Sequence, residues 1–223
     1  MPWDLSYQVF PINLKVLNIV ARVYCTKCQR LESLCLCSVL PELDNQVEVF
    51  FLQHPLETKH IKGTAWLTHA SLKNTRFEVG EQFSKAILDD ILSSNKRTFL
   101  LYPATQEEDV TTYQAESFPN EFSLSDCRVL ILDGTWKKTR KMLYLNPILA
   151  KLPRIVLVPS QPSEYDIRKQ KNGQSLSTLE ACRMLLSELE QNAKRYQPLD
   201  KVLDAIQSQY RLYAQANLQK GST

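Results

Sequence analysis

The sequence predicts an α/β fold in which a mostly parallel sheet is covered by helices on both faces. Short apolar segments of strand length alternate along the chain with longer segments of helical periodicity. Such alternation is typical of parallel sheets, whose strands need helical crossovers. A further observation is Asp133-Gly134, directly after the apolar run at residues 128–132. Open α/β sheets place ligand chemistry at the carboxyl ends of their strands.

The composition is that of an ordinary globular protein. The chain has 223 residues, of which 43% are hydrophobic and 23% are charged, and its formal net charge is +3. No window approaches the roughly 18 apolar residues of a membrane span, and the N-terminus lacks the pattern of a signal peptide. We therefore expect a cytoplasmic protein without a membrane partner. Because the net charge is small, the distribution of the cations matters more than their total.

The N-terminal part of the chain contains a weak helix candidate and a cysteine module. Residues 1–21 carry a mixed apolar pattern that is compatible with a helix. Four of the six cysteines lie in the module at residues 22–41, namely Cys25, Cys28, Cys35 and Cys37. A reducing cytosol disfavours disulfides, and zinc prefers four tetrahedral thiolates. This spacing predicts a closed structural Zn²⁺ site, with a redox pair or free thiols as the alternatives.

The next part of the chain is expected to supply two strands and two helices. Residues 47–52 form an apolar strand, which ends where His54 precedes a proline. Residues 64–72 and 81–92 show helical periodicity, and residues 98–102 form a second strand. The polar residues 104–126 have no regular pattern and are expected to be irregular, without an assigned role.

The second half of the chain continues the alternation. We expect a strand at residues 128–132, a helix at 136–149, a strand at 154–158, a helix at 178–195 and a final amphipathic helix at 199–213. Ser177 and Glu180 have the spacing of a capping box at the start of the fourth of these elements. The polar loop at residues 160–176 is long, and loops of such length in compact domains are usually functional.

The connection Asp133-Gly134-Thr135-Trp136 joins a buried strand to a basic helix start, and Lys137, Lys138, Arg140 and Lys141 follow it. The carboxylate is either a turn cap or a site residue. The glycine lets the chain turn and leaves room for a ligand. The aromatic side chain and the cations favour a site for an anionic partner that carries bases.

Six stretches of the chain, taken together in this order, are specific: the cysteine cluster and residues 52–57, 63–65, 132–136, 162–169 and 176–181. They resemble the DTW-domain family of tRNA-uridine aminocarboxypropyltransferases, which is related to the SPOUT methyltransferases. The resemblance is closest to the bacterial members, which act on a uridine of the tRNA variable loop. It implies that residues 1–41 are an N-terminal segment with a zinc module, and that residues 42–223 are a SPOUT-like catalytic domain with a knotted cofactor loop.

The resemblance also implies a reaction. The 3-amino-3-carboxypropyl group of S-adenosylmethionine moves to N3 of a uridine in tRNA, and methylthioadenosine is released. Asp133 is the candidate general base, or it only positions uracil. The candidate contacts to S-adenosylmethionine are Leu132, Gly134, Thr135, Trp136, Pro159, Ser163, Tyr165, Arg168, Ser177 and Thr178. The candidate contacts to tRNA are His54, Lys137, Lys138, Arg140 and Lys169.

Several of these residues have plainer interpretations. Trp136 either contacts the sulfonium or uracil, or belongs to the core. Ser177 and Thr178 either bind an anion at a helix N-terminus or only cap the helix. Two other functions compete for the whole chain: a SPOUT-type RNA methyltransferase and a zinc-ribbon RNA-binding protein without activity. A monomer is favoured, although a dimer is compatible with the sequence.

Overall fold

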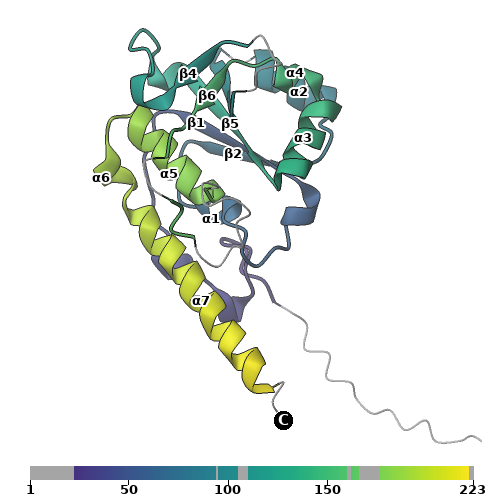
Figure 1. Cartoon of the computed structure of the whole chain (residues 1–223), viewed down its shortest axis with the longest axis vertical. Helices are drawn as coiled ribbons and strands as arrows, with labels where there is room; N and C mark the ends of the chain where they lie inside the picture. The colour runs from purple at the N-terminus through teal and green to yellow at the C-terminus, as the bar shows by residue number, and fades with distance from the viewer. Residues whose placement is uncertain (1–22, 94, 105–109, 160–161, 166–175, 221–223) are drawn as a thin grey trace, which may run out of the picture.

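The computed structural model describes residues 23–93, 95–104, 110–159, 162–165 and 176–220 (Figure 1). The described residues form a six-stranded sheet in the order β2-β1-β5-β3-β6-β4, in which all neighbouring strands are parallel. The prediction of an α/β fold with a mostly parallel sheet is therefore confirmed. The helix expected within residues 1–21 lies outside the described residues.

The strands are β1 (Glu48–Gln53), β2 (Thr75–Val79), β3 (Arg97–Leu101), β4 (Thr112–Gln114), β5 (Cys127–Asp133) and β6 (Arg154–Val156). The strands predicted at residues 47–52, 98–102, 128–132 and 154–158 are β1, β3, β5 and β6, with ends that differ by one or two residues. These four strands occupy the middle of the sheet. Their near-continuous apolar runs are what burial on both faces requires.

The strands β2 and β4 lie where the sequence did not predict any strand, and both are edges of the sheet. Arg76 and Glu78 interrupt the apolar pattern of β2, none of whose side chains is fully buried. The prediction that residues 104–126 are irregular is wrong for β4, whose Tyr113 packs in an aromatic cluster with Phe99. An edge strand has one neighbour and less burial, so its sequence carries a weaker signal.

The helices are α1 (Ala65–His69), α2 (Lys85–Ser93), α3 (Trp136–Leu145), α4 (Pro147–Ala150), α5 (Thr178–Leu189), α6 (Ala193–Tyr196) and α7 (Pro198–Lys220). Short 3₁₀ turns are η1 (Glu32–Leu34), η2 (Cys37–Val39), η3 (Pro55–Glu57), η4 (Ala115–Ser117) and η5 (Leu124–Asp126). Within the described part of the chain, no helix combines the length and the apolar character that a membrane span needs.

The single helix predicted at residues 136–149 is two helices. Asn146 separates α3 from α4 with φ −128° and ψ 69°, outside the helical region, and Pro147 begins the second helix. A residue that precedes proline avoids helical backbone angles, and this explains the break. The Asn146 side chain secures it by donating to the carbonyls of Glu81 (2.9 Å) and Met142 (2.7 Å).

Three other helix predictions were too long. The helix expected at residues 178–195 ends at Leu189, and α6 follows after Gln191, whose φ is +48°. The segment expected to be helical at 64–72 contains the shorter helix α1, and α2 begins four residues after the start expected at residue 81 and ends one residue beyond the end expected at residue 92.

The sheet separates two hydrophobic layers, and this confirms the predicted cover of helices on both faces (Figure 1). Val49 and Phe51 of β1 face a layer that includes residues of α1, α5 and α7. Phe50 and Leu52 face the opposite layer, built from α2, α3 and α4. Successive side chains of one strand thus enter different layers, as strand geometry requires.

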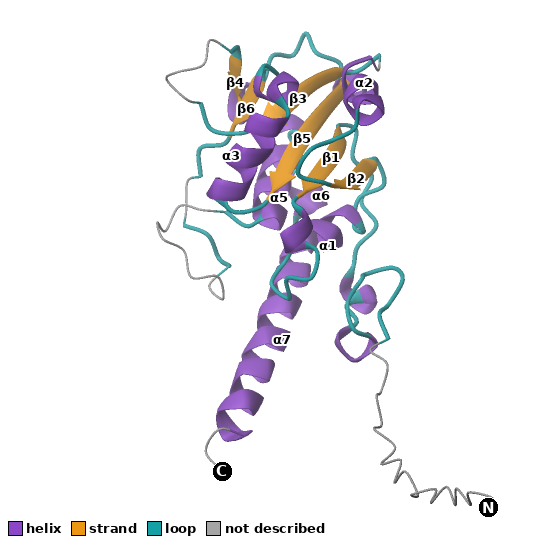
Figure 2. Ribbon diagram, turned by 90° about the vertical axis from the view of Figure 1, so that its right-hand side faces the viewer, coloured by secondary structure: helices purple, strands orange, loops and turns teal. Residues whose placement is uncertain are grey.

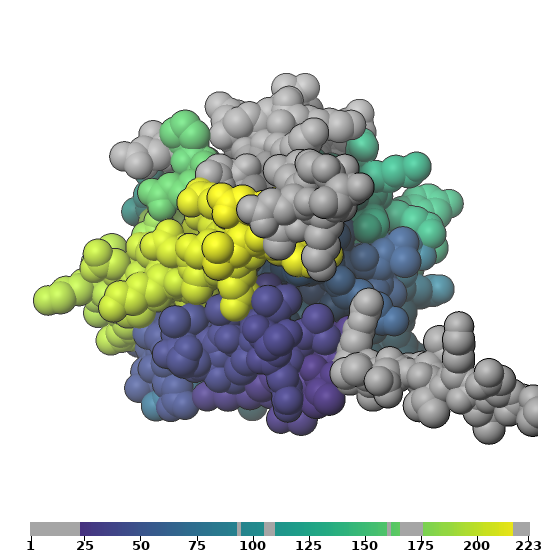
Figure 3. Space-filling view, turned by 90° about the horizontal axis from the view of Figure 1, so that it is seen from below, coloured from purple at the N-terminus to yellow at the C-terminus, as the bar shows by residue number. Residues whose placement is uncertain are grey.

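The cysteine module is packed against the first of these layers. Cys28 and Leu36 are buried in its apolar cluster. Arg30 extends from the module to α7, where its guanidinium donates to Gln209 (3.1 Å), and to the carbonyl of Ile61 (3.2 Å). Burial lowers the pKa of Arg30. Figure 3 shows the module side by side with α7, which extends beyond the α/β body in Figure 2.

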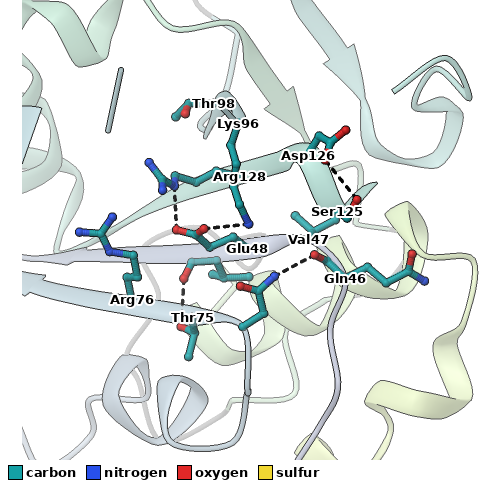
Figure 4. Close-up of polar contacts among 12 residues, drawn as sticks. Gln46, Val47, Glu48, Thr75, Arg76, Lys96, Thr98, Ser125, Asp126 and Arg128 are labelled. Atoms are coloured by element: carbon teal, nitrogen blue, oxygen red, sulfur yellow. Dashed lines mark hydrogen bonds and ion pairs between the residues drawn. The ribbon is translucent and has the colours of Figure 1, made fainter. Parts of the chain in front are cut away.

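An ion cluster lies where the parallel strands β1 and β5 begin (Figure 4). Glu48 accepts from the guanidinium of Arg128 at 2.7 Å and pairs with the ammonium of Lys96 at 2.9 Å. Arg128 also donates to the carbonyl of Ile91 (3.3 Å), and so ties the end of α2 to the sheet. Glu48 and Arg128 are both buried. This cluster marks the amino edge of the sheet, opposite the edge described next.

Candidate active site

The parallel register brings two of the sequence motifs together at the carboxyl edge of the sheet. Gln53, the last residue of β1, pairs with Asp133, the last residue of β5. The next backbone amide, that of His54, donates to the carbonyl of Asp133 at 2.9 Å. Parallel strands end at the same edge, and so residues 52–57 and 132–136 meet there.

The carboxylate of Asp133 is held by two side chains from other elements. Gln53 Nε2 donates to Oδ2 at 2.8 Å, and the hydroxyl of Thr178 donates to Oδ1 at 2.5 Å. Asp133 is 7% exposed. Thr178 is the first residue of α5, so the carboxylate links β1, β5 and the start of α5. Both donors are neutral, and their hydrogen bonds fix the orientation of the charged group.

A glycine is favoured at position 134 because a side chain there would be crowded, and not because of the backbone conformation. A Cβ atom at this position would lie 3.2 Å from Lys138 Cβ, 3.5 Å from Thr139 Cγ2 and 3.6 Å from His54 Cβ. No described glycine has a positive φ, so the turn at Gly134 uses backbone angles that other residues can also adopt. It serves the close packing of the first turn of α3 against the loop after β1.

His54 is buried, and both of its ring nitrogens have partners. Nδ1 accepts from the backbone amide of Leu56 at 3.1 Å, so Nε2 carries the proton and donates to Glu81 at 2.8 Å. Lys141 of α3 pairs with the other oxygen of Glu81 at 2.8 Å. Hydrogen bonds from Lys141 and then His54 lower the pKa of Glu81. His54 therefore joins the loop after β1 to the segment before α2.

The cations in the first turns of α3 fall into two groups, those held in ion pairs and those exposed to solvent. Lys138 pairs with Glu57 at 2.8 Å, as Lys141 does with Glu81, so both hold neighbouring loops. Lys137 and Arg140 are exposed and form no ion pair with the part of the chain that the structure describes. Of the predicted contacts to tRNA, Lys137 and Arg140 are thus open to solvent, whereas Lys138 already has a partner.

Trp136 is not a core residue. It is 54% exposed, and its indole meets Tyr102 edge to face, with ring centroids 5.8 Å apart. Thr135, at the N-cap position of α3, is also exposed, and its side chain makes no capping hydrogen bond. Leu132 packs partly buried against the second hydrophobic layer, and Pro159 is exposed after β6. Of these four residues, Trp136, Thr135 and Pro159 are exposed, and Leu132 is partly buried.

The capping box at the start of α5 is present and also holds a distant loop. Ser177 accepts from the amide of Glu180 at 3.2 Å, and the Glu180 carboxylate accepts from the amide of Ser177 at 2.7 Å. The same carboxylate accepts from the hydroxyl of Ser163 and the amide of Glu164, each at 2.8 Å. Ser163 and Glu164 of the motif at 162–169 therefore lie beside the start of the motif at 176–181.

Tyr165 is a buried residue of the same arrangement. It is 1% exposed, and its hydroxyl donates to the carbonyl of Lys62 at 2.7 Å. Thr64 is close by in sequence, and its hydroxyl accepts from the amide of Leu179 at 3.2 Å. The motif at 63–65 thus reaches the start of α5. Arg168 and Lys169, predicted to contact cofactor and tRNA, lie outside the described residues, as does most of the loop at 160–176.

Sequence reasoning did not assign the contacts of several residues of this edge. Gln53 donates to Asp133, Glu57 pairs with Lys138, and Glu81 accepts from His54. The hydroxyl of Thr64 accepts from a backbone amide in the first turn of α5. Gln53 was detectable, since it ends a predicted strand beside another predicted strand end. The contacts of Glu57 and Glu81 join residues far apart in the sequence, and no local pattern marks them.

The four clustered cysteines form a compact group of sulfur atoms. The Sγ atoms of Cys25, Cys28, Cys35 and Cys37 all lie within 4.8 Å of one another. Cys25 and Cys37 are 3.5 Å apart, and Cys28 and Cys35 are 3.7 Å apart. In a tetrahedral site with zinc–sulfur distances of about 2.3 Å, sulfur atoms are about 3.8 Å apart. The group is therefore compatible with a four-thiolate metal site.

Two of these thiols have shifted pKa values. The amide of Cys28, and then the thiol of Cys37, donate to Cys25 and lower its pKa to about 6. Burial, and then the contact with Cys25, raise the pKa of Cys37 to about 12. The lowered pKa of Cys25 favours its thiolate, which is the form that binds metal. Cys127 and Cys182 are buried in the body of the domain, apart from this group.

Comparison with known proteins gives a consistent result. The model of the DTW domain family matches residues 22–211, which include the cysteine module and the helices α1 to α6. A curated relative from Macaca fascicularis, tRNA-uridine aminocarboxypropyltransferase 2, is 31% identical over 192 residues. A protein of the same name from Drosophila melanogaster is 30% identical over 190 residues, and tRNA-uridine aminocarboxypropyltransferase A from Arabidopsis thaliana is 24% identical over 193 residues.

The relatives are longer than this chain. The alignment covers 83% of this chain and 62% of the Macaca fascicularis protein, 82% and 72% for the Drosophila melanogaster protein, and 76% and 73% for the Arabidopsis thaliana protein. The chain thus spans a little under two thirds of the first of these. Among solved structures, none matches this chain significantly. These relatives come from animals and a plant, so the expected closeness to bacterial members stays a prediction.

Proposed function

Because this chain belongs to the DTW domain family, we propose that it is a tRNA-uridine aminocarboxypropyltransferase. The names of its animal and plant relatives support this activity. The observation that carries the proposal is the carboxylate of Asp133, fixed by Gln53 and Thr178 at the carboxyl edge of the sheet. The proposed product is 3-(3-amino-3-carboxypropyl)uridine, in the variable loop of tRNA.

Bound S-adenosylmethionine supplies an electrophilic carbon next to its sulfonium. The chain's own task is to orient that carbon toward uridine N3 and to accept a proton. In the proposed step, the N3 proton moves to Asp133, N3 bonds to the γ-carbon of the methionine moiety, and the bond from this carbon to sulfur breaks. The electron pair of the broken bond stays on sulfur, so methylthioadenosine leaves as a neutral molecule. A base beside the attacking nitrogen would contribute about 10²- to 10⁴-fold to the rate.

The residues around Asp133 suit S-adenosylmethionine by their chemistry. The exposed face of Trp136 suits either a sulfonium, through a cation–π interaction, or uracil, by stacking. The backbone at Gly134, without a Cβ, allows close approach. Thr135 offers a free hydroxyl for the carboxylate of the methionine moiety. Leu132, Pro159, Ser163, Tyr165, Arg168, Ser177 and Thr178 complete the proposed contacts. Ser163, Tyr165 and Ser177 would act by shaping the backbone, since their side chains bond within the protein.

A SPOUT-like fold with a knotted cofactor loop belongs to the same proposal. The parallel sheet, the helices on both faces and the meeting of three motifs at one edge support it. A monomer in the cytoplasm, with residues 1–41 as a separate zinc segment and residues 42–223 as the catalytic domain, completes the assignment.

The experiment that tests the activity is mass spectrometry of tRNA nucleosides. Purified protein is incubated with S-adenosylmethionine and with tRNA from a strain that lacks the gene. A uridine that gains an aminocarboxypropyl group, together with released methylthioadenosine, is the expected result. A methylated uridine and S-adenosylhomocysteine would instead identify a methyltransferase. An unchanged tRNA, with S-adenosylmethionine bound, would contradict the transferase assignment.

We also propose that the cysteine group binds one structural Zn²⁺ per chain. Four thiolates leave no open position for chemistry, so the ion would stabilise the module. The expected content of the purified protein, measured by elemental mass spectrometry, is about one zinc per chain. Cys28→Ser is expected to lose the metal and lower the melting temperature, whereas Cys127→Ala keeps the metal. Equal zinc content in the two variants would contradict the site.

A further inference from the structure

The helix α3 has an exposed face that the reaction at Asp133 does not explain. Its buried face consists of Thr139, Met142 and Leu143, which pack against the sheet. On the opposite side, Tyr144 is 82% exposed, a value far above what a tyrosine of the core would show. An exposed aromatic side chain on a rigid helix is the residue type that proteins use to stack on bases.

Tyr144 is part of a stripe along the helix. Residues four apart lie on one side of an α-helix, so Trp136, Arg140 and Tyr144 follow one another along its exposed surface. Trp136 is 54% exposed, and Arg140 is exposed as well. With a rise of about 1.5 Å per residue, Trp136 and Tyr144 lie about 12 Å apart along the axis. We call these three residues the α3 stripe.

The charged residues of α3 itself are all cations. Lys137 and Lys141 flank it, and α3 contains no acidic residue. Lys141 is committed to Glu81, whereas Lys137 and Arg140 form no ion pair with described residues. A surface that alternates aromatic rings with cations is complementary to a single-stranded nucleic acid, with its bases and phosphates. A partner protein with an acidic surface would not need two base-sized rings at this spacing.

The stripe begins beside the reacting group. Trp136 is three residues from Asp133, and its ring is oriented by the edge-to-face contact with Tyr102. Arg154 in turn lies over the ring of Tyr102, with its guanidinium carbon 5.3 Å from the centroid. From this end the stripe leads away from the catalytic edge toward α4. A strand that delivers a uridine to Asp133 would therefore continue along α3.

We propose that the α3 stripe binds the single-stranded tRNA segment that flanks the target uridine, with Tyr144 stacked on a neighbouring base. This inference rests on the proposed function and names the surface that recognises its substrate. The ring of Tyr144 supplies the stacking, and Arg140 contacts a phosphate of the same segment. Such recognition of splayed bases is common in proteins that read RNA loops.

The experiment compares Tyr144→Ala, Tyr144→Phe and Tyr213→Ala with the wild type. Tyr213 of α7 is also exposed, at 53%, and serves as the matched control. The probe is tRNA from the deletion strain, and its dissociation constant is measured by fluorescence anisotropy. Loss of one stacked base is expected to weaken binding about 5- to 150-fold in Tyr144→Ala. Tyr144→Phe and Tyr213→Ala should bind as the wild type does.

The salt dependence of the same binding tests Arg140. Each phosphate contact to a single strand contributes about 0.7 to the slope of log affinity against log salt. Arg140→Gln is expected to lower the slope by about that amount, whereas Lys201→Gln, on exposed surface of α7, leaves it unchanged. Equal slopes in the two variants would contradict a phosphate contact at Arg140.

Transfer to the same tRNA sample is measured in parallel and separates two kinds of failure. If the wild type transfers the aminocarboxypropyl group and Tyr144→Ala binds tRNA equally well, the α3 stripe is wrong and the proposed function stands. If the wild type transfers nothing, the proposed function is wrong and this inference falls with it. Loss of binding in Tyr213→Ala as large as in Tyr144→Ala would also overturn the stripe.

Discussion

The two ends of strands β1 and β5 carry buried acids in very different surroundings. At the amino edge, Glu48 lies opposite Arg128 and also meets Lys96, so its charge is cancelled by cations. At the carboxyl edge, Asp133 lies opposite Gln53 and is held by this amide and by the hydroxyl of Thr178. At the amino edge two cations pair with the acid, whereas at the carboxyl edge an amide and a hydroxyl orient it.

The difference indicates which acid can do chemistry. Two cations stabilise the charged form of the carboxylate that they pair with, so this carboxylate is a poor base. Its removal leaves buried cations without a counter-charge. The side chains of Gln53 and Thr178 are neutral, and they fix the position of the Asp133 carboxylate by hydrogen bonds. The same pair of strands thus carries a structural acid at one end and a candidate catalytic acid at the other. Substitution of Glu48 should lower the stability, whereas substitution of Asp133 should lower the rate of transfer.

The largest expected effect is that of Asp133→Asn on the reaction. If Asp133 accepts the N3 proton, the amide removes the base while nearly preserving the shape, and the rate of transfer should fall about 10²- to 10⁴-fold. Single-turnover transfer at saturating S-adenosylmethionine and tRNA measures it. Asp126→Asn, just before the other end of β5 and exposed, is the control and should react at the wild-type rate. A loss smaller than this range would assign Asp133 to positioning.

The next effect belongs to the amino edge and concerns stability. Glu48→Gln leaves Arg128 and Lys96 uncompensated, and breaking a buried ion pair costs about 3–5 kcal/mol in the free energy of unfolding. Urea denaturation measures this loss. Arg76→Gln is the control, because its pair with Asp90 is partly exposed and should contribute no more than about 1 kcal/mol. The folded fraction of Glu48→Gln should still transfer at the normal rate.

The same cluster predicts a dependence of stability on pH. Burial alone would raise the pKa of Glu48, but hydrogen bonds from Lys96 and Arg128 outweigh it, and the pKa lies below its ordinary value. The folded state therefore binds this proton less readily than the unfolded state does. The stabilisation is complete above the unfolded pKa of about 4.3 and disappears as the pH falls through the folded value. Glu48→Gln should lack this acid-dependent part of the unfolding free energy.

The contrast also explains which parts of the fold the sequence could predict. The strands β1, β3, β5 and β6 occupy the middle of the sheet, so their apolar runs were readable from the chain alone. The edge strand β2 was not, because Arg76 and Glu78 face partly exposed positions. The break between α3 and α4 was readable in principle from Pro147. Strand order, by contrast, depends on packing between distant segments.

The motifs of the candidate site could be predicted from the sequence, but the hydrogen bonds that join them could not. Asp133 was found because a carboxylate at a strand end before a glycine is a local signal. Its partner Gln53 is 80 residues away, and the bond between His54 and Glu81 spans 27 residues. The hydroxyl of Thr178 looked like a cap or a cofactor contact, and only the fold brings it to Asp133. Long-range hydrogen bonds leave no periodicity for sequence reasoning to detect.

A smaller effect is expected from Thr178→Val, which keeps the shape and removes the donor to Asp133. Hydrogen bonds to charged groups are worth about 1.5–3 kcal/mol, so the rate of transfer should fall about 10- to 100-fold. The dissociation constant of tRNA should stay near wild type, and Thr178→Ser should restore the rate. Thr68→Val, which removes a buried hydroxyl bonded to a carbonyl of its own turn, is the control. Equal kinetic losses in both variants would indicate general destabilisation.

The smallest expected effects come from two ion pairs that are matched in exposure at opposite edges of the sheet. Lys96 and Glu48 have side chains 27% and 8% exposed, and Lys138 and Glu57 are 26% and 11% exposed. Lys96→Met and Lys138→Met should each lower the unfolding free energy by no more than about 1 kcal/mol, as partly exposed pairs do. Urea denaturation should therefore not distinguish the two variants.

Transfer assays should distinguish them, because only one of the two pairs borders the reacting edge. Glu57 follows β1, and Lys138 packs against Gly134, so Lys138→Met loosens the loop beside Asp133 and should slow transfer. Lys96→Met should leave the rate unchanged. The salt dependence of tRNA binding then assigns the role of Lys138. An unchanged slope means that Lys138 positions the loop through Glu57, whereas a slope lower by about 0.7 means that it contacts a phosphate.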